Sequence, residues 1–155
     1  MINKLSEVSK KARLGENVSI EAFSSIHPNV EIGDGTWIGS NVTIYPGARI
    51  GKNCRIFPGA VISAIPQDLK FKGEDSLVEI GDNTTIREFV TINRGTADKK
   101  TTKIGKDCLL MAYVHIAHDC LIHDRVIIAN SVQVAGHVTI DDWAFVGGSS
   151  AIHHF

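Results

Sequence analysis

The histidines of this 155-residue chain are concentrated in its last quarter or so. Six of the seven lie between positions 115 and 154. They are His115, His118, His123, His137, His153 and His154. An imidazole gains and loses a proton near neutral pH and also binds metals, so histidines gathered beside a carboxylate such as Asp119 form a candidate catalytic or binding site. The fold must bring these side chains together for any such chemistry.

A six-residue period runs along nearly the whole chain and predicts how the fold positions the histidines. An aliphatic residue recurs every six positions from Ile2 to Ile62, again from Ile80 to Ile92, and again from Ile104 to Ile152. This period fits neither an α-helix nor an alternating strand, but it suits a coil whose sides are single hexapeptides. Three such sides close a triangle of eighteen residues, which predicts an all-β, three-sided parallel β-helix.

Small and β-branched residues occupy the slot two positions before each aliphatic residue from Leu14 onward. All three cysteines, Cys54, Cys108 and Cys120, stand in this slot. A free thiol behaves as a small hydrophobic group, so these cysteines are interpreted as core residues without catalytic or metal-binding roles.

Glycine recurs one position after the aliphatic residue. The positions are Gly15, Gly33, Gly39, Gly51, Gly81, Gly105 and Gly147. Glycine adopts positive φ without steric cost, so the pattern predicts corners with positive φ at these positions.

Two breaks in the period predict loops, near residues 64–77 and 94–102. Asp68 and Glu74 in the first break, and Asp98 in the second, stand where the core needs aliphatic residues. Loops on a rigid scaffold often carry function, but solvated insertions explain both breaks equally well.

The eighteen-residue coil also predicts which histidines are neighbours. His118, Gly136 and His154 fall in one column over three coils, and Asp119, His137 and Phe155 fall in the next. At about 4.8 Å between stacked strands, His118 and His154 lie roughly 10 Å apart, a span that suits a substrate groove.

The repeat and several local motifs resemble known families. The aliphatic-Gly-x-x-small-x pattern is similar to that of the hexapeptide-repeat acyltransferase superfamily, whose β-helix is left-handed, against the usual right-handed preference. Longer motifs resemble the UDP-N-acetylglucosamine O-acyltransferases over all 155 residues. They are His115-Ile116-Ala117-His118-Asp119-Cys120, Gln67-Asp68-Leu69-Lys70-Phe71, Val90-Thr91-Ile92-Asn93-Arg94-Gly95-Thr96, Ala135-Gly136-His137-Val138 and Gly147-Gly148 with Ile152-His153.

This resemblance implies transfer of a 3-hydroxyacyl group from acyl carrier protein to the 3-hydroxyl of UDP-N-acetylglucosamine, the first step of lipid A biosynthesis. His118 matches the general base, Asp119 the carboxylate that orients it, and the Gly136 N–H the oxyanion donor. The implied substrate-binding residues are Gln67, Asp68, Lys70, His115, His137, His153 and His154. No metal and no cofactor are implied, since the acyl thioester is itself a substrate. Asn93 stands where some relatives carry histidine.

Composition and length set the remaining expectations. The net charge is −1 without a basic stripe, which argues against a nucleic-acid partner. No apolar stretch is long enough to cross a bilayer and none resembles a signal peptide, so a cytoplasmic location is expected. Residues 1–155 are predicted to form one β-helix domain and a homotrimer, whereas relatives continue into a C-terminal helical domain that this chain does not contain.

Two other functions fit the same scaffold. The γ-type carbonic anhydrases bind a metal through histidines at a subunit interface, and the spacing of His118 and His123 is a weak signal for such a site. A non-catalytic trimeric scaffold is the third possibility.

Overall fold

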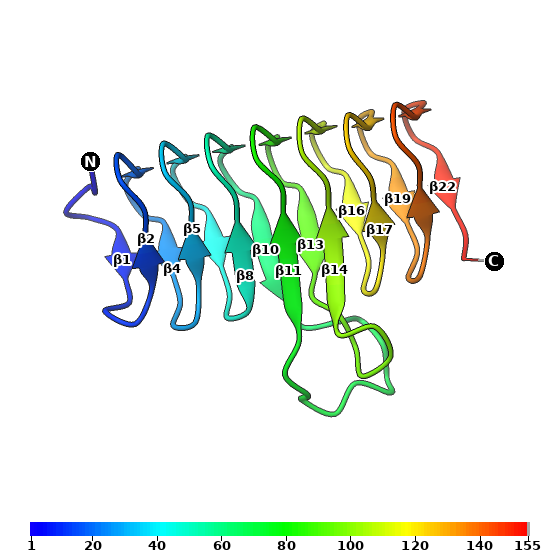
Figure 1. Ribbon diagram of the computed structural model, residues 1–155, viewed down its shortest axis with the longest axis horizontal. Coiled ribbons are helices and arrows are strands. Elements are labelled where there is room, and N and C mark those ends of the chain that lie inside the picture. Colours follow the sequence, from blue (N-terminus) through cyan, green and yellow to red (C-terminus); the bar gives the residue numbers. More distant parts are fainter. Residues whose placement is uncertain (155) are drawn as a thin grey trace.

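Short strands wind around one long axis in the computed structural model, which describes residues 1–154 (Figure 1). The strands form three parallel sheets. Neighbouring strands within a sheet are three apart in sequence, because each coil contributes one strand to each sheet. The chain is therefore a left-handed parallel β-helix, as predicted.

The strands alternate among the three sheets in a fixed order. The first sheet contains β1 (Glu7–Val8), β4 (Ser25–Ile26), β7 (Thr43–Ile44), β10 (Val61–Ala64), β13 (Thr91–Asn93), β16 (His115–Ile116), β19 (Gln133–Val134) and β22 (Ala151–Ile152). The second contains β2 (Arg13–Leu14), β5 (Glu31–Ile32), β8 (Ala48–Ile50), β11 (Leu77–Ile80), β14 (Thr101–Ile104), β17 (Leu121–Ile122) and β20 (Thr139–Ile140). The third contains β3 (Ser19–Ile20), β6 (Trp37–Ile38), β9 (Arg55–Ile56), β12 (Thr85–Ile86), β15 (Leu109–Leu110), β18 (Ile127–Ile128) and β21 (Phe145–Val146).

The aliphatic positions form the core of the prism. Ile92, Ile116 and Val134 lie opposite one another on successive coils and are almost completely buried. The three cysteines are buried and unpaired by disulfides, as expected of small core residues. Burial raises the pKa of the Cys120 thiol to about 11, which keeps it protonated at neutral pH.

The glycines after the aliphatic positions have a different role from the one predicted. None of the seven has positive φ; the left-handed corner lies two residues further on, most often at asparagine, as at Asn53 and Asn83. The expectation of positive φ was therefore wrong. At five of the seven positions, all but Gly39 and Gly147, glycine is required because successive coils approach closely. A Cβ atom at Gly33 would lie 2.7 Å from the backbone of Gly51, and one at Gly81 would lie 2.6 Å from the backbone of Gly105.

Gly81→Ala is expected to lower the free energy of unfolding by about 2 kcal/mol, because the new methyl group must push two coils apart. Gly147→Ala is the matched control, since a Cβ atom there meets nothing within 4 Å among the described residues beyond its chain neighbours, and its effect should stay within about 0.5 kcal/mol. Urea denaturation measures both. Equal transition midpoints for the two variants would contradict close packing as the reason for glycine.

Two loops leave the prism at the corner between the first and second sheets. Residues 65–76 connect β10 to β11, and residues 94–100 connect β13 to β14. Both project from the same side of the molecule, below the row of strands in Figure 1. They touch each other, because the Ala97 N–H donates a hydrogen bond of 3.0 Å to Glu74 Oε1. Within residues 1–154 there is no helix of the length and hydrophobicity that a membrane span requires.

Candidate active site

Five of the six C-terminal histidines, all but His123, gather at or beside this same corner, next to the loops. Strand β16 pairs with β19, and β19 with β22, in an unbroken register of eighteen residues. His118, Gly136 and His154 therefore occupy equivalent corner positions on three successive coils, as the column argument predicted. Phe155, which the same argument assigned to the column of Asp119 and His137, lies outside the described residues.

His118 and Asp119 form a hydrogen-bonded pair. His118 Nδ1 lies 2.9 Å from Asp119 Oδ2, so the ring donates its Nδ1 proton to the carboxylate and keeps a lone pair on Nε2. That second nitrogen faces the first loop, with Asp68 Oδ2 3.9 Å away. The His118 side chain is 14% exposed and borders a cavity.

Asp119 is the buried member of the pair. Its side chain is inaccessible to solvent and accepts hydrogen bonds from the Thr96 N–H at 3.0 Å and the Thr96 hydroxyl at 2.5 Å, besides the one from His118. Burial acts to raise the pKa of Asp119, but the hydrogen bonds from Thr96 and His118 outweigh it and hold the pKa below its usual value. Asp119 is therefore a carboxylate at neutral pH and can stabilise a protonated His118.

Gly136 lies directly against the imidazole. A Cβ atom at this position would fall 2.7 Å from both Cε1 and Nε2 of His118, so a side chain here would displace the ring. The Gly136 N–H has no hydrogen-bond acceptor within residues 1–154. A free backbone donor beside a proton acceptor is the arrangement that acyl transfer requires for its oxyanion.

Three adjoining cavities collect the other predicted site residues. The first, the His118 cavity, measures about 610 Å³ and is lined by Gln67, Asp68, Lys70, His118, Gly136, His137 and His154. The second, the His115 cavity, measures about 550 Å³ and is lined by Gln67, Thr91, His115 and His153 among others. The third, the loop cavity, measures about 560 Å³ and shares Asp68, Lys70 and His137 with the first. All ten predicted residues thus lie at one corner, with Asp119 buried behind His118.

The histidines differ in their surroundings. His137 packs edge-on against His118, with ring centroids 5.1 Å apart. His115 lies in the neighbouring cavity, where its Nδ1 is 2.7 Å from the Thr91 hydroxyl, and burial lowers its pKa with a smaller contribution from His118. His153 and His154 stack on each other at 4.2 Å. His115 and His153 therefore line the neighbouring His115 cavity rather than the His118 cavity.

Three polar residues of the site were missed by sequence reasoning. Thr96 holds Asp119, and Asp98 Oδ2 lies 3.3 Å from His137 Nδ1. Asn93 is 4% exposed, and its Oδ1 has no hydrogen-bond partner within residues 1–154 although it borders the His118 cavity. Two features of the sequence point to these residues: the motif that ends at Thr96, and the break in the six-residue period at Asp98.

The metal-binding alternative fits the geometry less well. One ligand atom each of His118, Asp119 and His137 lies within 4.8 Å of the others. A metal would have to compete for Asp119 oxygens that already accept three hydrogen bonds. His123 does not join this group and lies 3.8 Å from Asp141 instead.

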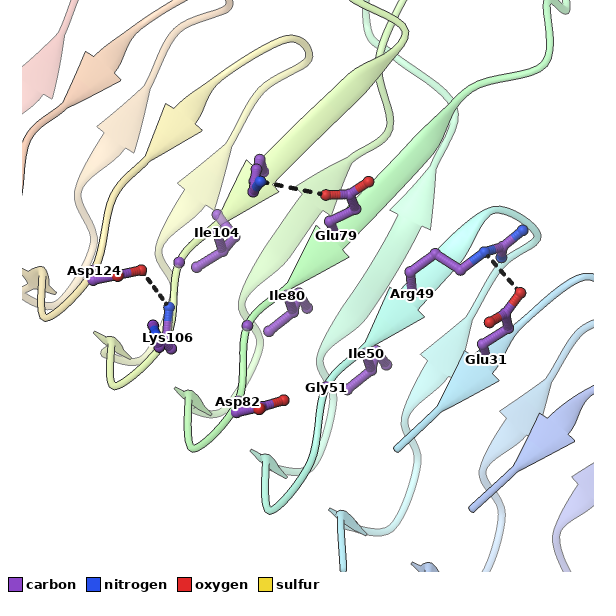
Figure 2. Close-up of a pocket in the computed structure, with 13 residues that line it drawn as sticks. Glu31, Arg49, Ile50, Gly51, Glu79, Ile80, Asp82, Ile104, Lys106 and Asp124 are labelled. Atoms are coloured by element: carbon purple, nitrogen blue, oxygen red, sulfur yellow. Dashed lines mark hydrogen bonds and ion pairs between the residues drawn. The ribbon is translucent and has the colours of Figure 1, made fainter. Parts of the chain in front are cut away.

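A further cavity of about 600 Å³ lies on the outer face of the second sheet (Figure 2). Its charges are paired along the strands, with Arg49 Nε 3.1 Å from Glu31 and Lys103 Nζ 3.7 Å from Glu79. It contains no histidine, and its ion pairs link side chains of neighbouring coils.

The repeats match a known family over two stretches. Residues 31–64 and 101–136 fit the bacterial transferase hexapeptide family with six repeats. Together with the three-sided coil, this match places the chain among the hexapeptide-repeat proteins.

Two curated relatives identify the family of this chain more specifically. The acyl-(acyl-carrier-protein) UDP-N-acetylglucosamine O-acyltransferase of Herminiimonas arsenicoxydans is 48% identical over 156 residues, covering 100% of this chain and 60% of that protein. The enzyme of that name from Aliarcobacter butzleri is 50% identical over 155 residues, again covering 60% of its length. This chain belongs to the UDP-N-acetylglucosamine O-acyltransferase family. It spans about 60% of the length of these curated relatives.

Solved structures agree with this assignment. The UDP-N-acetylglucosamine acyltransferase LpxA of Bacteroides fragilis superposes with a TM-score of 0.95 at 47% identity, over 99% of this chain and 67% of that one. LpxA of Acinetobacter baumannii superposes with a TM-score of 0.98 at 45% identity, over 99% of this chain and 60% of that one. The family predicted from the sequence motifs is confirmed.

Proposed function

We propose that this chain carries the acyl-transfer site of an enzyme that moves a 3-hydroxyacyl group from acyl carrier protein to the 3-hydroxyl of UDP-N-acetylglucosamine, the first step of lipid A biosynthesis. The observation that carries the proposal is the His118–Asp119 pair, with Nε2 of His118 open to a cavity beside the free Gly136 N–H. Family membership supports the choice of substrates.

His118 acts as the general base in this mechanism. Nε2 takes the proton of the sugar 3-hydroxyl while its oxygen attacks the thioester carbonyl. The Gly136 N–H donates to the oxyanion of the tetrahedral intermediate. The C–S bond then breaks, and the departing thiolate takes the proton from the His118 imidazolium. The products are the sugar ester and the free thiol of the carrier protein. Asp119 stabilises the imidazolium throughout.

The residues around the pair are proposed to bind the sugar nucleotide. Asp68 and Lys70 come from the first loop and border two of the three cavities, where Asp68 can accept hydrogen bonds from sugar hydroxyls and Lys70 can pair with a phosphate. The remaining candidates are Gln67, His115, His137, His153 and His154. The mechanism requires no metal and no cofactor, and a cytoplasmic location and the lack of a nucleic-acid partner stay predictions.

A homotrimer is expected in solution. Leu69 at the rim of the His118 cavity is fully exposed, which is unusual for a large apolar side chain and is consistent with a neighbouring subunit covering the site. Light scattering at micromolar concentration should give about three times the chain mass of 16.8 kDa. A mass equal to one chain would contradict this expectation.

An acyl-transfer assay tests the function. UDP-N-acetylglucosamine and 3-hydroxyacyl carrier protein are supplied to a hybrid that joins residues 1–155 to the C-terminal part of a curated relative. Formation of the O-acylated sugar nucleotide by a metal-free protein supports the proposal. Stoichiometric zinc with carbon dioxide hydration would favour the carbonic anhydrase alternative, and a folded trimer with neither activity would favour a scaffold.

A further inference from the structure

The loop of residues 94–100 reaches the catalytic pair from outside the regular coil. We propose that Thr96 of this loop is a positioning residue, which fixes the Asp119 carboxylate and through it the His118 imidazole for proton transfer. This inference rests on the proposed function for its catalytic meaning, whereas the contacts themselves stand independently.

Thr96 holds both oxygens of the carboxylate. Its N–H donates to Asp119 Oδ1 at 3.0 Å and its hydroxyl donates to Oδ2 at 2.5 Å. His118 contacts only Oδ2. A carboxylate held by His118 alone could rotate about its Cβ–Cγ bond, whereas two donors from one residue fix its plane. The orientation of the imidazole then follows from the carboxylate plane.

Burial makes these bonds effective. Asp119 has no exposed surface and Thr96 is 8% exposed, so water does not compete for the carboxylate. Burial alone would raise the pKa of Asp119, and among the groups that lower it Thr96, through its hydroxyl and its N–H, contributes more than His118 does. The threonine is therefore the principal stabiliser of the charged form that the base requires.

Thr96 is itself fixed by both loops. Its carbonyl accepts a hydrogen bond of 2.8 Å from the Lys100 N–H, and its hydroxyl accepts a weaker one of 3.3 Å from the Asp98 N–H. The next residue, Ala97, donates to Glu74 in the first loop. The same first loop carries Asp68, 3.9 Å from His118 Nε2. The second loop is thus part of the site and not a solvated insertion.

The titration of Asp119 tests the positioning role without any substrate. Thr96→Val keeps the shape of the side chain but removes the hydroxyl donor, so the pKa of Asp119 should rise, as followed by carboxyl ¹³C NMR in the 155-residue chain. Thr96→Ser restores the donor and should return the pKa towards the original value. The other titratable groups that face Asp119 are His118 and His137, which all variants retain. An unchanged titration in a folded Thr96→Val protein would overturn the proposal.

Kinetics of the hybrid protein separate positioning from stability. Thr96→Val should lower kcat about tenfold, the equivalent of roughly 1.4 kcal/mol, with KM changed less than twofold, and Thr96→Ser should recover most of the loss. Thr36→Val is the matched control, because Thr36 is also buried but donates to the Gly51 carbonyl in the N-terminal coils. It should lower the melting temperature and leave kcat unchanged.

The two readouts distinguish failure of this inference from failure of the proposed function. Should the unmodified hybrid transfer no acyl group, the proposed function fails while the titration still decides whether Thr96 fixes Asp119. Should Thr96→Val not fold, Thr96→Cys preserves the shape with only a weak donor and should raise the pKa of Asp119 in the same direction. Wild-type kcat in a folded Thr96→Val or Thr96→Cys enzyme would contradict the positioning role.

Discussion

Replacing His118 with alanine is expected to lower the turnover of acyl transfer by roughly 10²- to 10⁴-fold, because the sugar hydroxyl loses the base that takes its proton. The fold should survive. The His118 side chain lies at a corner outside the aliphatic core, and within residues 1–154 its one close hydrogen bond is to Asp119. Steady-state kinetics of the hybrid protein measure the effect, and the melting temperature shows that the coil is intact.

Asp119→Asn provides the comparison for the first prediction. The amide keeps the size of the side chain but no longer stabilises the imidazolium by charge, so turnover should fall less than in His118→Ala. Turnover close to that of the unmodified enzyme in a folded His118→Ala protein would rule out the mechanism. A larger loss in Asp119→Asn than in His118→Ala would show that the carboxylate, and not the imidazole, is the essential group.

Ile128→Asp is expected to destabilise the coil by several kcal/mol, because a carboxylate without a partner enters a slot that is completely buried. Ile128 lies between Leu110 and Val146 in the third sheet, so the charge would face two apolar neighbours. Thermal and urea denaturation of the 155-residue chain measure the loss.

Ile127→Asp is the matched control for this change. Ile127 is the adjacent residue of the same strand and the same type, but its side chain points outward and is partly exposed. The same substitution should therefore change the melting temperature of a single chain only slightly. Equal destabilisation by the two variants would contradict the conclusion that the aliphatic side chains recurring every six residues point into the core.

The fold could be predicted because one period specifies both the core and the register. Each aliphatic residue marks an inward slot, and the third slot along the chain is its neighbour in the next coil, as the pairing of Ile116 with Val134 illustrates. The reason why glycine recurs after the aliphatic positions could not be predicted from the period. A period shows where a small residue recurs, but only coordinates reveal that Gly81 is limited by the backbone of the next coil and not by its φ angle.

The site could be predicted in part for a related reason. His118 and Gly136 lie within the regular coil, so their separation of eighteen residues predicts that they are neighbours on successive coils. Thr96 and Asp98 lie in a loop that interrupts the count, and their positions depend on contacts such as that between Ala97 and Glu74. Such contacts between two loops have no periodic signature, so the partner of Asp119 could not be found from spacing.

The structure of the hybrid protein with bound UDP-N-acetylglucosamine is the most direct test of the central claim, that His118 activates the sugar. The account predicts the sugar in the His118 cavity, with its 3-hydroxyl oxygen within about 3.2 Å of His118 Nε2. A sugar bound in the charged cavity on the second sheet (Figure 2), or one whose 3-hydroxyl points away from His118 in an active enzyme, would contradict it.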